Sequence, residues 1–149
     1  EQFAPVNLAQ LCQTMVEVYE PTASQRNQTV MYTGPDEVSV QGEKNLLGQL
    51  VANLIENALR HTDEAAQISV AIVQTPNEII LSVTDDGPGI PKSEFDRVTQ
   101  RLYRLDRSRN TPGNGLGLSL VDGVARLHGA KMELNDADPG LRVIIKFAT

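Results

Sequence analysis

Predicted helices and pairs of predicted strands follow one another in blocks along this chain, and this order restricts the fold more than any other feature. Three segments have apolar residues at helical spacing: Leu8 to Tyr19, 43–61, and Leu116 to about Leu127. Three strand pairs are separated by turn residues: 28–32 with 37–41, 67–73 with 78–84, and 131–135 with 141–147. Strict alternation of single strands and helices is missing. The sequence therefore predicts an α+β two-layer sandwich, with helices on one face of a mixed or largely antiparallel sheet.

Punctuating residues set the expected boundaries of these elements. Asn7 is placed to cap the first helix and Pro21 to follow its end. Pro91 opens a short helix predicted over 92–104, and 105–114 is polar and rich in turn residues, which is typical of a mobile loop. The 149 residues contain no repeat and no internal boundary, so one domain with an ordinary core is expected.

Composition excludes several classes of function. The formal net charge of −6 disfavours long nucleic acid as a partner, because phosphate backbones require a basic surface. Cys12 is the only cysteine and is expected in the core, which excludes a disulfide framework and a structural zinc site. No apolar run approaches the ~20 residues that cross a bilayer. One local excess of positive charge contains Arg97, Arg101, Arg104, Arg107 and Arg109. Taken alone, such a run is typical of a solvated helix face and loop.

The helix predicted over 43–61 carries a polar stripe. Its aliphatic residues form a broad apolar face, whereas Asn53, Asn57, Arg60 and His61 fall within an arc of about 100°. Two Asn residues in a helix interior require an explanation, because Asn is a poor helix former. An amide oxygen suits Mg²⁺ bound together with phosphates, Arg60 suits phosphate charge, and His61 suits stacking on a base. The alternative is an exposed polar face with a Glu56–Arg60 ion pair.

Two glycine-rich segments follow this helix. Asp85-Asp-Gly-Pro-Gly89-Ile90 comes at a predicted strand end, where a buried Asp that accepts from an exocyclic amine selects adenine over guanine; an ordinary turn is the alternative. Gly113-Asn-Gly115-Leu-Gly117-Leu118 leads into the last helix, whose N-terminus favours phosphate. The dinucleotide fingerprint and the Walker A pattern both fail, since no strand precedes this run and no Gly-Lys-Ser/Thr follows it. The order of the three segments indicates an ATP site.

These segments resemble the motifs of the catalytic and ATP-binding domain of bacterial sensor histidine kinases, within the superfamily of gyrase, Hsp90, histidine kinases and MutL. Residues 46–62 resemble its N box, Asp85 to Ile90 its first glycine box, and Gly113 to Leu118 its second. The resemblance covers nearly the whole chain and implies one domain, residues 1–149, from a longer protein. It also implies the Bergerat fold, a mixed, mostly antiparallel sheet covered on one face by about three helices.

The resemblance implies roles for individual residues, with ATP and Mg²⁺ as cofactors. Asp85 recognises the adenine amine, Asn57 binds Mg²⁺, and Asn53, Arg60 and His61 line the phosphate and base region. Arg101 and Arg104 help to place the γ-phosphate, so with Asn53 they are the predicted catalytic residues. The nucleotide and its lid are bounded by Gly87, Gly89, Ile90, Gly113, Gly115, Leu116, Gly117 and Leu118.

The implied reaction transfers the γ-phosphoryl group of Mg-ATP to a histidine of a separate dimerisation and phosphoacceptor domain, in two-component signalling that leads to a response regulator. His128 lies at a helix end, where a capping role is expected, and neither it nor His61 has the setting of that acceptor. The implied location is cytoplasmic, with an inner-membrane sensor as one form of the parent protein.

Two departures from the family pattern leave alternatives open. Thr99 and Leu102 stand where the family carries Phe, which leaves a non-catalytic nucleotide-binding module as one alternative. Asn53 stands where ATPases of the superfamily carry a Glu base, which disfavours the other alternative, a hydrolysing ATPase.

Overall fold

The computed structural model describes residues 3–87 and 116–149 of the chain. Its helices are α1 (Leu8–Ser24), α2 (Lys44–Arg60) and α4 (Leu116–Leu127). Its strands are β1 (Ala4–Asn7), β2 (Thr29–Thr33), β3 (Ser39–Gly42), β4 (Gln67–Gln74), β5 (Glu78–Asp85), β6 (Lys131–Asp136) and β7 (Leu141–Ala148). The short helix and the loop predicted between 92 and 114 lie outside the described residues.

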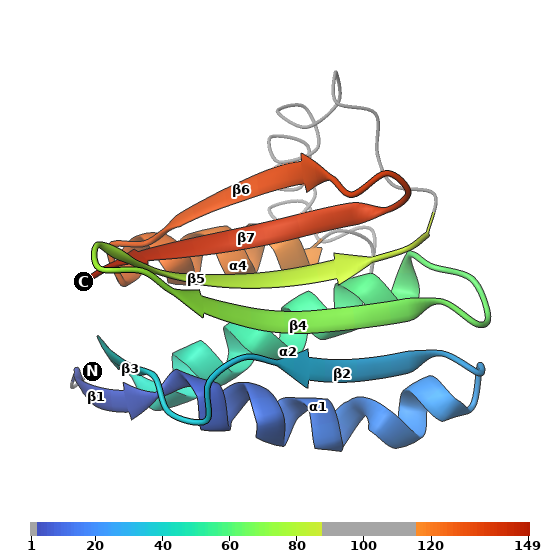
Figure 1. The fold of residues 1–149 in the computed structure, drawn as a ribbon, viewed down its shortest axis with the longest axis horizontal. Coiled ribbons are helices and arrows are strands. Elements are labelled where there is room, and N and C mark those ends of the chain that lie inside the picture. The colour runs from blue at the N-terminus through green and yellow to red at the C-terminus, as the bar shows by residue number, and fades with distance from the viewer. Residues whose placement is uncertain (1–2, 88–115) are drawn as a thin grey trace.

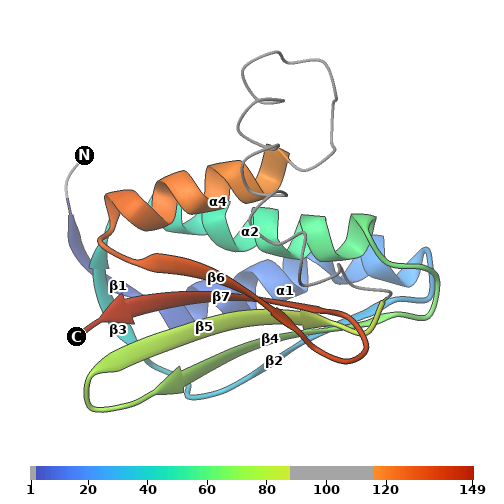
Figure 2. The same cartoon turned by 90° about the horizontal axis from the view of Figure 1, so that it is seen from above.

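Five strands form one sheet in the order β2-β4-β5-β7-β6, which runs from the bottom to the top of the sheet in Figure 1. β2 and β4 are parallel, and the other neighbouring pairs are antiparallel. The three helices lie against one face of this sheet (Figure 2). β5 alternates buried and partly exposed residues because only one of its faces is covered. The predicted two-layer α+β sandwich, with a mixed and mostly antiparallel sheet, is confirmed.

The predicted hairpin of 28–32 with 37–41 is wrong. β2 pairs in parallel with β4, and β3 pairs antiparallel with β1, a short strand that the sequence did not indicate. The side chain of Asn7 explains part of this arrangement: its Oδ1 accepts from the N–H of Gln10, as predicted for a helix cap, and also from the N–H of Val38. The start of α1 is therefore hydrogen-bonded to the residue that precedes β3, and β3 pairs with β1. β2 pairs with β4 in the main sheet instead.

The first helix also continues past its predicted end, because α1 runs through Pro21 to Ser24. Proline removes one N–H donor from a helix, but this loss is small in a last turn on the surface. Contacts beyond the helix hold that turn. Ala23 is fully buried, and its carbonyl accepts from the N–H groups of Arg26 and Gln28. Burial of Ala23 thus overrides the proline signal.

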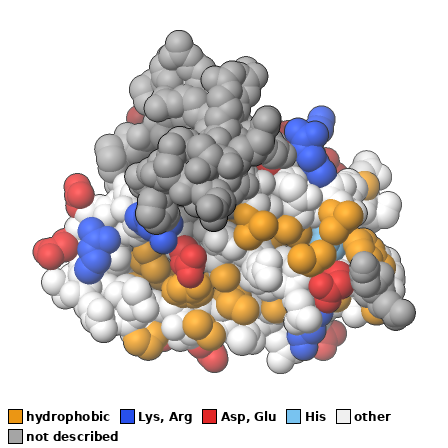
Figure 3. All heavy atoms as spheres, turned by 180° about the vertical axis from the view of Figure 1, so that it is seen from behind, with side chains coloured by type: hydrophobic (Ala, Val, Ile, Leu, Met, Phe, Trp, Pro, Cys, Tyr) orange, Lys and Arg blue, Asp and Glu red, His pale blue; other side chains and the backbone are white. Residues whose placement is uncertain are grey.

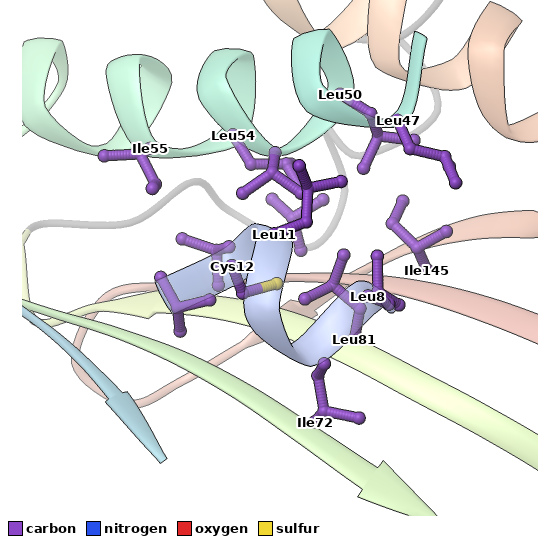
Figure 4. Close-up of a cluster of buried hydrophobic side chains, with 14 of the residues drawn as sticks. Leu8, Leu11, Cys12, Leu47, Leu50, Leu54, Ile55, Ile72, Leu81 and Ile145 are labelled. Atoms are coloured by element: carbon purple, nitrogen blue, oxygen red, sulfur yellow. The ribbon is translucent and has the colours of Figure 1, made fainter. Parts of the chain in front are cut away.

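The core lies between the helices and the sheet, as Figure 4 shows. α1 contributes Leu8 and Leu11, and α2 presents a run of leucine and isoleucine residues toward the strands. The labelled residues that meet there are Leu8, Leu11, Cys12, Leu47, Leu50, Leu54, Ile55, Ile72, Leu81 and Ile145. The apolar face predicted for 43–61 is therefore the buried face of α2, and its polar stripe lies to one side of this contact.

Charged side chains are dispersed on the side that the helices cover. Figure 3 shows this side, where the Lys and Arg side chains of the described residues lie apart from one another. The arginine-rich run from Arg97 to Arg109 lies outside those residues. None of the helices in residues 3–87 and 116–149 is long and apolar enough to cross a bilayer.

Cys12 occupies the core, as predicted, and we expect it to be unreactive in the folded protein. Burial raises the pKa of its thiol to about 12, so the reactive thiolate is scarce at about pH 8. Iodoacetamide should label the native protein at least ~100-fold more slowly than the urea-unfolded protein. Mass spectrometry of the alkylated chain measures both rates. Equal rates would show that Cys12 is reached without unfolding.

Candidate functional site

The polar stripe of α2 contains one buried residue, Asn57, whose side chain forms no hydrogen bond within the described residues. Asn57 is 6% exposed, whereas Asn53 is half-buried and Arg60 and His61 are exposed. The amide of Asn57 makes no hydrogen bond to any other described residue. No fully buried side-chain nitrogen or oxygen in the described residues lacks a hydrogen-bond partner, so the unpaired amide of Asn57 is the part of this residue that reaches the surface, where a ligand can bind it.

The other residues of the stripe differ in their contacts. Asn53 donates through Nδ2 to the carbonyl of Gln49 (2.7 Å), so its side chain lies along the helix. Glu56 accepts a hydrogen bond from the Tyr19 hydroxyl of α1. The alternative Glu56–Arg60 ion pair does not occur in the described part of the chain. Arg60 is therefore left at the surface beside Asn57, where its charge is available to an anion.

Asp85 is the inward-facing residue at the end of β5. It continues the buried positions of Leu81 and Val83, and it is 8% exposed. Its Oδ1 accepts from the N–H of Gly87 (2.9 Å) and from the N–H of Leu141 in β7 (3.3 Å). Within residues 3–87 and 116–149, Oδ2 has no donor. One carboxylate oxygen is thus held by the backbone, and the other is left for a ligand that donates a hydrogen bond.

The pKa values of Asp85 and of His61, at the end of α2, are both shifted, and each group affects the other. Burial raises the pKa of Asp85, although the two backbone N–H groups act against that rise and the Asp86 carboxylate adds to it. His61 is exposed over much of its surface, but partial desolvation of its ring lowers its pKa, the Arg60 charge lowers it further, and the Asp85 carboxylate opposes both effects. The fold brings two of the three motifs together, because a Cβ placed on Gly87 in the Asp85 turn would lie 2.7 Å from Cγ2 of Thr62, just beyond α2.

The turn between β6 and β7 supports Asp85 from the other side, a contact that sequence reasoning missed. Gly140 has φ +106°, and a Cβ placed on it would lie 1.8 Å from the carbonyl oxygen of Asp85. Only glycine fits such an approach. The segment Asp138-Pro139-Gly140 was recognisable as a turn, but nothing local indicated that its glycine lies on the backbone of Asp85.

The C-terminus of α2 is capped by two residues from the connection between α1 and β2. Arg26 donates through Nη1 to the carbonyl of Leu59 (3.0 Å) and through Nη2 to that of Thr62 (2.9 Å). Gln28, which is buried, donates through Nε2 to the carbonyl of Leu59 (3.1 Å). These bonds satisfy carbonyl groups that the helix end leaves unpaired. Neither residue carries a sequence signal for this role.

The remaining predicted site residues are placed only in part. Gly87 lies in the turn after β5. Leu116 and Gly117 begin α4, and Leu118 is buried in the hydrophobic core. Outside the described residues lie Gly89, Ile90, Arg101, Arg104, Gly113 and Gly115, together with Thr99 and Leu102. The phosphate and lid assignments of those residues stay predictions.

His128 takes part in packing at the opposite end of α2. Its Nδ1 bonds to the carbonyl of Val124 in the last turn of α4 (2.8 Å), which fits the predicted capping role. Its Nε2 accepts from the N–H of Glu43 (3.1 Å), the residue that caps α2, and its ring stacks on Phe3. Since Nε2 accepts a hydrogen bond, the imidazole proton is on Nδ1. His128 thus joins the end of α4 to the start of α2.

Comparison with known proteins adds to this geometry. The chain is 36% identical over 126 residues to the adaptive-response sensory kinase SasA of Synechocystis, covering 83% of this chain and 33% of SasA. It is 29% identical over 133 residues to the signal transduction histidine-protein kinase BaeS of Escherichia coli, covering 88% of this chain and 28% of BaeS. The chain therefore spans about a third of the length of these relatives.

A solved structure and a family profile agree with these relatives. The mycobacterial sensor histidine kinase MprB superposes with a TM-score of 0.83 at 28% identity, covering 98% of this chain and 97% of that structure. Residues 42–149, which include α2 and the Asp85 turn, match the family described as histidine kinase-, DNA gyrase B-, and HSP90-like ATPase. The chain belongs to this family.

Proposed function

We propose that residues 1–149 are one ATP-binding catalytic domain of a sensor histidine kinase, which transfers the γ-phosphoryl group of Mg-ATP to a histidine on a separate helical domain. The observation that carries this proposal is Asp85. Its Oδ1 is occupied by two backbone N–H groups, and its Oδ2 has no donor among the described residues. A carboxylate oxygen held in this way accepts from the exocyclic amine of adenine and repels the carbonyl oxygen that guanine carries at the same position.

The polar stripe of α2 is suited to the phosphates. The amide oxygen of Asn57 is a hard ligand of the kind that Mg²⁺ prefers when phosphate oxygens and water complete its coordination. This amide has no hydrogen-bond partner among the residues that the structure describes, which supports this role. Mg²⁺ held there would neutralise phosphate charge. Arg60 at the surface and His61 beside Asp85 extend the same site toward the phosphates and the base.

The transfer step needs positioning and charge stabilisation more than acid–base chemistry. A nitrogen of the acceptor imidazole forms a bond to the γ-phosphorus, the bond from that phosphorus to the bridging oxygen breaks, and ADP leaves with the electron pair. The positive side chains of Arg60, Arg101 and Arg104 are proposed to stabilise the transferring group. The acceptor histidine belongs to the partner domain, and a response regulator then receives the phosphoryl group.

Hydrolysis of ATP by the isolated chain is disfavoured by Asn53. An amide cannot remove a proton from water, and the Nδ2 of Asn53 is already bonded to the carbonyl of Gln49. Phosphohistidine formed from labelled ATP on an acceptor domain supplied in trans is the expected result. Binding of ATP without transfer would instead favour a non-catalytic nucleotide-binding module, and release of phosphate by the chain alone would favour an ATPase.

Replacing Asn57 with Ala should impair the Mg²⁺-dependent reaction without unfolding the domain. We expect phosphotransfer to fall by about 100-fold or more, because the charge of the γ-phosphate is then less well neutralised. The variant should also lose nucleotide affinity in the presence of Mg²⁺. Its loss of affinity should be much smaller when binding is measured without Mg²⁺. Asn45→Ala is the matched control, since Asn45 is an exposed residue in the first turn of the same helix. Equal loss of binding with and without Mg²⁺ would contradict the metal assignment.

A further inference from the structure

Thr62 is a buried residue just beyond α2, and its hydroxyl both donates and accepts a hydrogen bond. It is 3% exposed. Its Oγ1 donates to the carbonyl of Ala58 (2.8 Å) and accepts from Nε2 of Gln28 (2.9 Å). A hydroxyl bonded on both sides allows one rotamer of the side chain, which also determines where the γ-methyl group points.

That methyl group faces the turn that holds Asp85. A Cβ placed on Gly87 would lie 2.7 Å from Cγ2 of Thr62 and 3.3 Å from Oδ1 of Asp85. Gly87 is not among the described glycines with a positive φ, so space, and not backbone conformation, requires a glycine here. The N–H of the same Gly87 donates to Asp85. Contacts therefore run from Gln28 through Thr62 and Gly87 to the Asp85 carboxylate.

We propose that Thr62 is a positioning residue of the nucleotide site, whose γ-methyl group, oriented by Gln28, holds the Asp85–Gly87 turn in the position that discriminates adenine from guanine. The proposal rests on the proposed role of Asp85. Discrimination by a carboxylate depends on distance, because the attraction to the adenine amine and the repulsion of the guanine carbonyl both weaken as the carboxylate moves away. A residue that limits this movement affects selectivity without touching the base.

Two substitutions of Thr62 separate its methyl group from its hydroxyl. Thr62→Ser keeps both hydrogen bonds and removes the contact with Gly87. It should lower the ratio of the GTP Kd to the ATP Kd by about threefold to tenfold, the effect of one displaced hydrogen bond, with little change in Tm. Thr62→Val keeps the methyl group but removes the acceptor that Thr62 offers to buried Gln28 and the donor that it offers to the carbonyl of Ala58. It should lower Tm more than Thr62→Ser does and keep a nucleotide ratio closer to that of the wild type.

Calorimetric titration with ATP and GTP, together with thermal unfolding, measures both quantities. Thr33→Ser is the matched control, since Thr33 is an exposed threonine at the end of β2. A ratio that Thr62→Ser leaves unchanged would overturn the proposal. A ratio that follows Tm across the three variants would also overturn it, because Thr62 would then act only through stability.

A size exchange gives a second test of the same contact. Gly87→Ala should weaken ATP binding, because its Cβ meets the Thr62 methyl group, and the double variant Gly87→Ala with Thr62→Ser should recover part of that affinity. No recovery would count against the proposal, because a neighbour other than Thr62 would then limit the turn. Failure of the site itself is distinguishable: ATP affinity would then be insensitive to Asp85→Asn. If Asp85→Asn weakens ATP binding and the Thr62 variants do not change selectivity, only the role of Thr62 is refuted.

Discussion

Replacing Asp85 with Asn is expected to lower the affinity for Mg-ATP by about 10- to 100-fold, the range for a hydrogen bond to a charged group, and to raise the Tm of the nucleotide-free protein. Asn keeps an oxygen that accepts from the N–H groups of Gly87 and Leu141. Its NH₂ group takes the place of Oδ2 and cannot accept from the adenine amine. Stability rises because the buried negative charge is removed.

The sign of the stability change follows from the raised pKa of Asp85. Burial makes the ionised form less favourable in the folded than in the unfolded protein. As pH rises from the ordinary pKa of 3.8 through the raised value, the unfolded state ionises first and the folded state loses stability. The difference in Tm between Asp85→Asn and wild type should thus be present at neutral pH and vanish below the ordinary pKa.

Calorimetry with Mg-ATP and unfolding scans across this pH range measure both effects. ATP affinity of the wild type should begin to fall, on acidification, at a higher pH than an exposed carboxylate would give. Asp86→Asn is the matched control, because exposed Asp86 keeps an oxygen for the N–H of Gln67 and lies next to the same turn. Equal ATP affinity of wild type and Asp85→Asn would rule out the adenine assignment.

Replacing Gly140 with Ala should be the most destabilising single-methyl change among the described glycines outside the site. Its Cβ would meet the carbonyl oxygen of Asp85 at 1.8 Å, and φ +106° is unfavourable for any L side chain. Overpacking costs about 1–3 kcal/mol and a positive φ about 1–2 kcal/mol, so we expect about 2–5 kcal/mol in the free energy of unfolding. Urea denaturation measures this loss, and ATP affinity should fall with it, because Asp85 must move.

Two other glycines separate the components of this effect. Gly129 has φ +69° but open space around its Cβ, so Gly129→Ala should cost only the conformational part, about 1–2 kcal/mol. Gly123 lies within α4 and also has open space, so Gly123→Ala should stabilise the protein by up to about 1 kcal/mol. Equal costs at Gly140 and Gly129 would contradict the close contact with Asp85.

Elements with a clear local pattern were predicted closely. The helix expected over 43–61 is α2, Lys44–Arg60, and the terminal strand pair is β6 with β7. Asp85 was expected at the end of a strand, and it is the last residue of β5. These predictions succeed because helical periodicity, strand alternation and turn residues are properties of a few neighbouring residues.

Predictions that depended on the partners of a segment failed or were not made. β2 and β3 are short runs flanked by turn residues, and such runs look the same whether they pair with each other or with distant strands. Pro21 predicts the end of the first helix too early, because the burial of Ala23 cannot be read from the sequence around it. In both cases tertiary contacts overrode a local signal.

The class of the fold, the polar stripe of α2, the Asp85 turn and the family resemblance follow from residue types at short spacings, which can be read along the chain. The contacts that hold the site in place do not, because they join residues that are distant in the sequence. Gln28 meets Thr62 across 34 positions, and Leu141 meets Asp85 across 56. A hydrogen bond between residues so far apart requires only a donor and an acceptor at the right place in space, and a single sequence does not record that place.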